Sequence, residues 1–175
     1  MHGISFGIVG CLITLAAGCA HAPPPPPCDQ PEPITVVLKA GEPLNPDDSG
    51  QSFPTIVRVY MLKSANLLET TTADEVVRHD KEVLGGDLVE VQEITVKPRG
   101  SETLTFKRQD EAKQLAVVGL FRAPTGNTWR AIETLPAADK DFCHRTNGGP
   151  RIYLTLDGNR VVVTPPARAT TGGAK

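Results

Sequence analysis

Cysteine and histidine are the side chains of this chain best suited to chemistry, and two of them are adjacent. Cys143 and His144 have the composition of a thiol nucleophile with its general base. Neighbouring residues in a loop rarely point at one reacting atom, and no third residue is placed to orient the base. A zinc site built from these two residues with Cys28 and His21 lacks the repeated ligand spacing of known zinc sites. We therefore expect no catalytic residue, no metal site and no cofactor, and we predict that the protein is not an enzyme.

A second pattern partly matches a calcium-binding loop. Asn45, Asp47 and Ser49 occupy the first, third and fifth ligand positions, and Gly50 occupies the sixth. The twelfth position needs a bidentate glutamate and holds Ile56, and no helices are expected on either side. Asn, Asp, Pro and Gly are also the residues that shape turns. The segment is therefore interpreted as a turn-rich connection between two strands.

Composition limits the class of protein. The chain has 175 residues and a formal net charge of -2, which fits one modest domain and lacks the clustered basic excess of a nucleic-acid binder. Sixteen Pro and sixteen Gly leave little room for long helices. One Trp and two Tyr are too few for an aromatic platform that stacks sugars. These numbers predict a small globular domain that binds no nucleic acid.

Residues 1–18 are expected to be a signal peptide. Residues 3–18 carry no charge, are mostly apolar and end in small residues before Cys19, which is typical of a signal peptide rather than a spanning helix. The stretch before Cys19 resembles the lipobox of bacterial lipoproteins, in which the cysteine thiol receives diacylglycerol. A rival box ending at Cys11 follows too short an apolar run, and an uncleaved membrane anchor is the remaining alternative. Because Ala20 rather than Asp follows Cys19, the resemblance implies attachment to the outer membrane, with the domain in the periplasm.

Residues 19–33 are expected to form a lipidated, proline-rich linker. Residues 21–33 contain seven prolines, five of them consecutive. Proline fixes φ and has no N–H, so the segment favours polyproline II at about 3.1 Å per residue, or roughly 40 Å in total. Proline runs also bind aromatic grooves, but an anchor directly before this run favours a semi-rigid spacer.

Two further cysteines follow the lipidated one. Cys28 lies in the linker and Cys143 in a late loop. In an oxidising periplasm a disulfide between them is one outcome, and free thiols or intermolecular pairing are the others. An intramolecular bond would contribute about 4 kcal/mol in the chain-entropy model. It would also shorten the free spacer to below about 30 Å.

The rest of the chain is expected to form short strands and one helix. Thr72 and Glu75 form a capping-box pattern, and Gly85 ends the helical periodicity that follows it. Asp157 and Gly158 between two alternating runs indicate a β-hairpin. Seven or eight short strands predict an all-β sandwich over residues 34–164, with this one additional short helix and a disordered tail at 165–175. The expected strands cover residues 34–40, 55–62, 88–96, 102–107, 115–121, 129–135, 152–156 and 160–164.

The connection between the first two strands, residues 41–53, is longer than most hairpin loops. It presents Leu44 among acidic and turn residues and ends with Phe53. Long loops on a rigid sandwich are common binding sites. We therefore expect this loop to be the candidate functional site.

Several motifs together resemble the TssJ family, the lipoprotein of the type VI secretion system. They are the lipobox, residues 44–47 with Gly50 in the long loop, the strand at 54–62, the acidic helix that begins at the Thr72–Glu75 capping box, residues 115–122, and Trp129 with Arg130. The resemblance covers about residues 34–164. The chain departs from the family at Met61, where the family often has Gln, in the long proline linker, and in an extra loop at 137–150.

The resemblance implies a transthyretin-like β-sandwich without catalytic activity, anchored in the outer membrane. It implies binding to the periplasmic C-terminal region of the inner-membrane protein TssM, within the TssJ–TssL–TssM membrane complex. In the family the loop between the first two strands takes part in that contact. In this chain the corresponding residues are Leu44, Asn45, Pro46, Asp47, Asp48, Ser49 and Gly50.

Our hypothesis gives these loop residues three roles. Leu44 supplies apolar contact, Asp47 and Asp48 supply charge complementarity, and Pro46 and Gly50 preorganise the loop. The alternative is that all of them only shape the turn. Other functions remain open at the level of the sequence: a periplasmic lipoprotein sandwich that binds a small ligand or carbohydrate, a thiol enzyme, or a purely structural lipoprotein.

Overall fold

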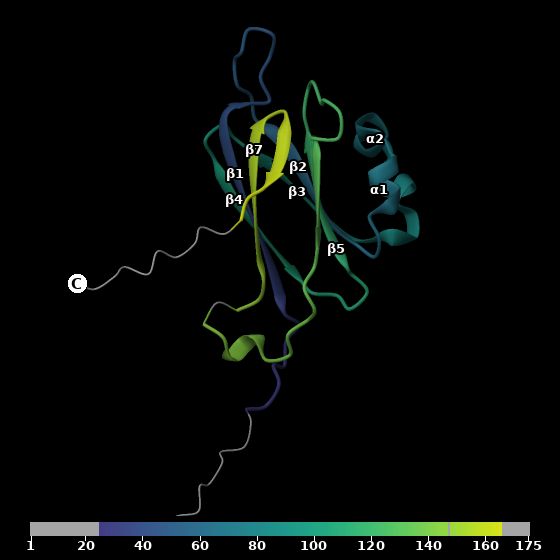
Figure 1. Ribbon diagram of the computed structural model, residues 1–175, viewed down its shortest axis with the longest axis vertical. Helices are drawn as coiled ribbons and strands as arrows, with labels where there is room; N and C mark the ends of the chain where they lie inside the picture. Colours follow the sequence, from purple (N-terminus) through teal and green to yellow (C-terminus); the bar gives the residue numbers. More distant parts are fainter. Residues whose placement is uncertain (1–24, 147, 166–175) are drawn as a thin grey trace, which may run out of the picture.

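Two four-stranded sheets pack face to face to form a β-sandwich in the computed structural model (Figure 1). The structure describes residues 25–146 and 148–165, so the predicted signal peptide 1–18, Cys19, the start of the linker and residues 166–175 lie outside the described residues. One sheet has the order β4 (Ser101–Lys107), β1 (Pro33–Leu44), β7 (Arg151–Gly158) and β8 (Arg160–Val163). The other has the order β3 (Leu88–Val96), β2 (Thr55–Leu62), β5 (Gln114–Leu120) and β6 (Arg130–Thr134).

Alternating side chains explain why these segments form strands around one core. Along β1, Ile34, Val36 and Leu38 are fully buried, while the residues between them face outward. Strand β5 is instead almost continuously buried, because the outer face of its sheet is also covered. The predicted β-sandwich is thus confirmed, with all eight expected strands present.

Two helices cover the outer face of the β3-β2-β5-β6 sheet (Figure 1). Helix α2 (Ala73–Leu84) begins at the predicted capping box, in which Thr72 and Glu75 bond each other's backbone N–H. The short helix α1 (Asn66–Thr70) precedes it and was not expected, because five residues are too few to show helical periodicity. The Arg130 guanidinium stabilises the end of α1 by donating to the carbonyl oxygens of Glu69 and Thr71 at 2.6 and 3.0 Å.

Most strand boundaries agree with the prediction, but the end of β1 does not. Strands β2 and β3 have the predicted bounds, and Asp157 pairs with Arg160 in the predicted β7–β8 hairpin. Strand β1 continues beyond the predicted end at Ala40 as far as Leu44, with a shift in its register against β7. Gly41 lies in this irregular stretch, although the predicted connection began at this residue. The free loop is therefore shorter than predicted.

The sandwich has two opposite ends formed by different segments of the chain (Figure 1). At the linker end, the first described residues meet the segment 136–150, which contains a short 3-10 helix at Phe142–His144. At the opposite end, here called the distal end, lie the β1–β2 loop, the β5–β6 loop and the β7–β8 turn. Strand β1 connects the two ends with 12 residues, which span about 35–40 Å at roughly 3.3 Å per residue.

None of the helices in the described part of the chain is long and apolar enough to cross a membrane.

Candidate partner-binding site

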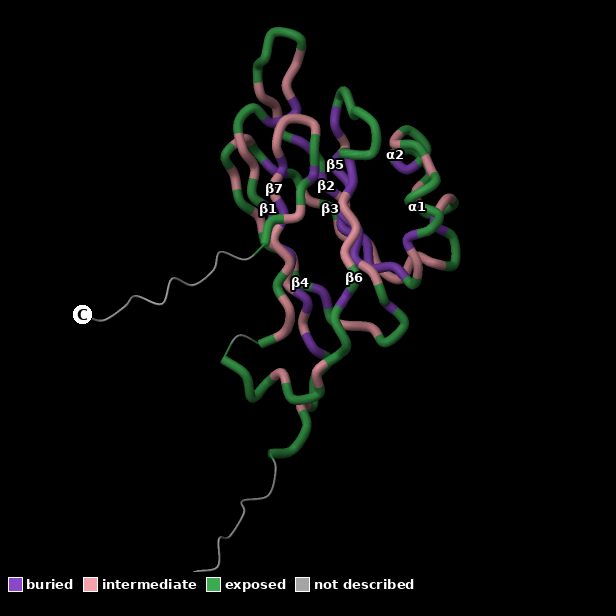
Figure 2. The backbone as a smooth tube through the Cα atoms, in the orientation of Figure 1, coloured by how far each residue is buried: buried purple, intermediate pink, exposed green. Residues whose placement is uncertain are grey.

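The β1–β2 loop is closed at its base by Leu44 and Phe53. The Phe53 N–H donates to the Leu44 carbonyl oxygen at 2.9 Å, and the Leu44 N–H donates to Ser52 Oγ at 3.2 Å. These bonds fix residues 45–52 as a loop that projects beyond the ends of the strands. Figure 2 shows an exposed tip above a buried base.

Asp47 organises the tip of this loop. Its Oδ1 accepts hydrogen bonds from the Ser49 hydroxyl at 2.7 Å and from the N–H groups of Ser49 and Gln51, both at 2.9 Å. The Gly50 N–H donates to the Asp47 carbonyl oxygen at 2.9 Å, and Gly50 adopts φ 83°, a conformation that favours glycine. The hydrogen bonds from Ser49 and Gln51 lower the pKa of the Asp47 carboxyl. The Asp47 charge therefore stabilises the loop itself.

Asn45 connects the loop to two neighbouring segments and to the loop's own last residue, Pro54. It is only 4% exposed and adopts φ 46°, which Asn tolerates better than most residues. Its side-chain Oδ1 accepts from the Arg122 N–H at 2.8 Å, and its Nδ2 donates to the Pro54 carbonyl oxygen at 3.2 Å. Its backbone N–H donates to the Gly158 carbonyl oxygen at 2.8 Å. Asn45 thus joins the β1–β2 loop to the β5–β6 loop and the β7–β8 turn.

Arg122 belongs to the same surface although it comes from the β5–β6 loop. Its guanidinium lies 5.2 Å from the centroid of the Phe53 ring, a cation–π distance. Arg122 is exposed, and it is 77 positions from Asn45 in the sequence. The sequence does not indicate Arg122 as a site residue, because no motif or spacing connects these two segments before the sheet is formed.

The structure contradicts the role predicted for Leu44. We expected Leu44 to supply apolar contact to a partner, but its side chain is fully buried in the core. The physical reason is that β1 continues past Gly41 and keeps Leu44 on the inward face. Leu44 and Asn45 therefore support the loop from below.

The exposed part of the site is smaller than predicted, because Leu44 and Asn45 are buried. It also includes Arg122, which was not among the predicted residues. The Asp48 side chain forms no hydrogen bond within the described residues, so its charge is available to a partner. Pro46 and Asp47 are half-buried. Arg122 supplies a cation beside the loop. The exposed residues of the tip are Asp48, Ser49, Gly50 and Gln51.

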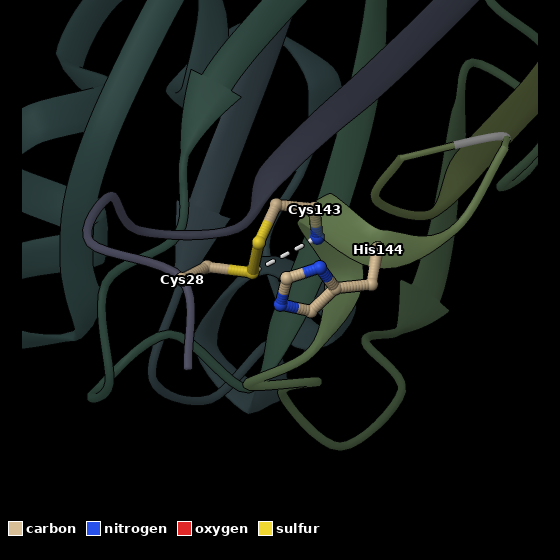
Figure 3. Close-up of side chains that lie close together, drawn as sticks. All are labelled: Cys28, Cys143 and His144. Carbon is tan, nitrogen blue, oxygen red and sulfur yellow. Dashed lines mark hydrogen bonds between the residues drawn. A yellow bond between two sulfur atoms is a disulfide. The ribbon is translucent and has the colours of Figure 1, made fainter. Parts of the chain in front are cut away.

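The cysteine–histidine group lies at the linker end, far from the loop. Figure 3 shows Cys28 and Cys143 joined in a disulfide, with the His144 ring beside it. Ligand atoms of the three residues lie within 4.8 Å of one another, and they are the one such group among the described residues. In the disulfide neither sulfur is a thiolate, so this arrangement offers no metal ligand pair and no thiol nucleophile.

A charged network holds α2 on the sheet. Asp80 on α2 accepts from the Tyr60 hydroxyl at 2.9 Å and pairs with Arg58 at 3.3 Å. Arg58 also bonds Glu93 at 2.8 Å across the neighbouring strand. His79 is exposed and pairs with Glu82 at 3.6 Å. The network is structural, because it bonds α2 to β2 and β2 to β3.

Comparison with known proteins gives a family. The family model described as type VI secretion lipoprotein (VasD, EvfM, TssJ) matches residues 32–157. No curated protein matches the chain.

Three solved structures share the fold. The type VI lipoprotein TssJ1 from Pseudomonas aeruginosa is 24% identical, with a TM-score of 0.60, over 78% of this chain and 99% of that chain. Serratia marcescens Lip, described as a membrane bound component of the type VI secretion system, is 19% identical with a TM-score of 0.68, over 77% and 99%. A chain in the structure described as the TssM C-terminal domain (869-1107) from EAEC is 21% identical with a TM-score of 0.62, over 77% and 98%.

The predicted resemblance is therefore confirmed at the level of the family. The matched region contains strands β1 to β6, all of β7 except its last residue, and the whole β1–β2 loop. Because the family model covers most of the sequence, the chain belongs to the type VI secretion lipoprotein family that includes TssJ.

Proposed function

We propose that this protein is a lipid-anchored, non-catalytic component of the type VI secretion membrane complex that binds the periplasmic C-terminal region of TssM with its distal end. In this proposal Cys19 carries the lipid, the outer membrane holds the protein, and the domain faces the periplasm. The observation that carries the proposal is the position of the loop in a member of this family: the β1–β2 loop and the linker lie at opposite ends of the sandwich (Figure 1).

This polarity supports a bridging role. A domain tethered at its linker end presents its distal end away from the membrane that holds it. Strand β1 alone adds about 35–40 Å to the reach of the linker. A partner that rises from the opposite membrane would therefore meet the β1–β2 loop first.

The solved structures support the choice of partner. The match in the EAEC structure spans 77% of this 175-residue chain and 98% of the matched chain. The matched chain is therefore much shorter than segment 869-1107 of TssM. A TssJ-like chain in a structure described by its TssM domain supports contact between the two proteins. The description of the Serratia protein as membrane bound supports the anchor.

The geometry of the tip assigns separate tasks to its two carboxylates. Asp47 is engaged by Ser49 and Gln51, so it shapes the loop. Asp48 is exposed and without a hydrogen bond in the described chain, so it contributes charge complementarity. Ser49 and Gln51 add exposed polar groups at the rim, and Pro46 and Gly50 restrict the backbone.

A charge test separates contact from turn formation. Asp48→Asn removes charge and keeps shape, so we expect weaker binding to the TssM region and a shallower dependence of log Kd on salt concentration. The matched control is Glu111→Gln, which removes one exposed carboxylate far from the distal end and is expected to leave both quantities unchanged. Equal effects of the two variants would contradict a specific role for Asp48.

Anchoring is tested separately. Cys19→Ser in the full chain removes the proposed acylation site, and we expect the protein to move from the membrane fraction to the soluble periplasmic fraction. Fractionation of outer and inner membranes locates the unmodified protein. Recovery of the Cys19→Ser protein in the outer membrane would contradict the lipid anchor.

A further inference from the structure

We infer that the Cys28–Cys143 disulfide is a thiol–disulfide exchange site that sets the working length of the linker, with a dithiol as its reaction partner. The inference rests on the proposed lipid anchor, because the linker has a working length only if its other end is held. The exchange chemistry itself depends only on the described residues.

The position of the disulfide indicates that it fixes the linker. It joins residues separated by 115 positions and connects the segment before β1 to the 3-10 helix Phe142–His144 (Figure 3). Cys143 is exposed and Cys28 is half-buried, so an external thiol can reach the bond. The core of the sandwich lies beyond this bond and contains neither sulfur.

The surroundings of the two sulfurs are not equivalent. The Cys143 N–H donates to Cys28 Sγ at 2.9 Å (Figure 3). A hydrogen-bond donor stabilises a thiolate on the sulfur that it contacts, and the better-stabilised thiolate is the better leaving group. The Sγ of Cys143, the more exposed of the two residues, is therefore the atom attacked, and Cys28 leaves.

The exchange proceeds in two balanced steps. One thiolate of the dithiol forms a bond to Cys143 Sγ, the bond between the two protein sulfurs breaks, and its electron pair stays on Cys28. The second thiol of the dithiol, once deprotonated, attacks the reductant's own sulfur in the mixed disulfide and releases Cys143 as a thiolate. The protein disulfide is reduced by two electrons and the dithiol is oxidised to a disulfide. The reverse reaction closes the bond again.

A second attachment limits how much of the linker is released. The Arg108 Nε donates to Glu32 Oε2 at 2.7 Å, with both side chains at most 7% exposed. The Arg108 N–H also donates to the Glu32 carbonyl oxygen at 2.9 Å. Opening the disulfide therefore moves the point of attachment from Cys28 to Glu32, and four more residues add about 12 Å at 3.1 Å per residue.

The contacts that remain on the released segment are weak. The Cys28 N–H donates to the Lys140 carbonyl oxygen at 3.0 Å, and His144 Nε2 donates to the Pro26 carbonyl oxygen at 2.7 Å. Exposed hydrogen bonds contribute little net free energy, because water competes for the same donors and acceptors. They cannot hold the segment once the covalent bond is open.

The chemistry is tested on the full lipidated chain by trapping. The oxidised protein is mixed with a Cys-X-X-Cys oxidoreductase in which the second cysteine is replaced by serine, so that the mixed disulfide cannot resolve. We expect a covalent adduct that peptide mapping places on Cys143, formed while circular dichroism shows a folded domain. An adduct on Cys28, or an adduct formed only in denaturing urea, would overturn the inference.

The length change is tested on the same protein in a supported bilayer by neutron reflectometry. We expect the domain to move away from the bilayer by up to about 12 Å when a dithiol reduces the protein. The Cys28→Ser, Cys143→Ser double variant is the matched control and is expected to show the longer distance with or without reductant. An unchanged distance between the domain and the bilayer on reduction would overturn the inference. A chain that does not stay on the bilayer would instead contradict the proposed anchor, and the trapping experiment alone would then decide the exchange chemistry.

Discussion

At the scale of residues, the candidate site separates into supporting and exposed side chains. Leu44 and Asn45 are buried beneath the loop, and Asp47 uses its charge inside it. Asp48 and Arg122 are exposed, and in the proposed function Asp48 contributes charge to the contact with TssM. A turn and a binding loop select the same residue types, so the sequence could not separate these roles. Burial and hydrogen bonding in the folded protein separate them.

Asn45 gives the first prediction at this scale. Asn45→Ala leaves the Arg122 N–H without its acceptor and the left-handed backbone without a tolerant residue, so we expect a loss of about 1–3 kcal/mol in the free energy of unfolding. Urea denaturation measures it. The control Asn45→Asp keeps an acceptor for the Arg122 N–H and is expected to lose less. Equal losses in the two variants would contradict the importance of that hydrogen bond.

Asp47 gives a prediction about pH. Hydrogen bonds from Ser49 and Gln51 lower its pKa in the folded protein, so they favour the ionised carboxylate. The order that they give the loop is complete above the ordinary carboxyl range and is lost as the pH falls through the lowered pKa. NMR titration should show the Ser49 and Gln51 amide signals shifting together in acid. Asp47→Asn should abolish that common shift, and its persistence in the variant would assign it to another group.

At the scale of elements, short sequence patterns correctly predicted a helix start and a turn that depend on neighbouring residues alone. The capping box located α2, and the Asp157–Gly158 signal located the β7–β8 turn. The predicted end of β1 at Ala40 was wrong. Pairing with β7 extends the strand past Gly41, a residue type that usually ends a strand, as far as Leu44. The contacts of Asp80 were also missed, because they depend on how α2 packs against the sheet.

Tyr60 gives the prediction for this packing. Tyr60→Phe removes the bond to Asp80, and we expect a loss of roughly 1–2 kcal/mol in the free energy of unfolding at neutral pH. Burial, together with the bond to Asp80, raises the pKa of Tyr60. The unfolded protein therefore ionises this tyrosine first, and the advantage of the native protein over Tyr60→Phe should shrink as the pH rises above about 10. Urea denaturation at neutral and alkaline pH compares the two proteins, and a difference that grows with pH would contradict this account.

At the scale of the whole molecule, the proposed function assigns different tasks to the two ends of the sandwich. The linker end is held by the disulfide and by the buried Glu32–Arg108 pair. The distal end carries the loop, supported by Asn45 and Arg122. The sequence predicted the order of anchor, spacer and domain and the long loop, and the family resemblance predicted the contact of that loop with TssM. Only the folded chain puts the loop and the linker at opposite ends.

The most direct test of the central claim is calorimetric titration of a soluble form, residues 20–175, against the periplasmic C-terminal region of the cognate TssM. Three proteins are compared: the native sequence, a tip variant in which residues 46–51 are replaced by glycines while Leu44, Asn45 and Phe53 are kept, and a control with Ala137 and Ala138 replaced by glycine at the linker end. We predict that the native protein and the control bind with the same Kd and that the tip variant binds at least about tenfold more weakly, a difference of roughly 1.4 kcal/mol. Equal binding by the folded tip variant, or no binding by the folded native protein, would contradict the claim that the distal loop holds TssM.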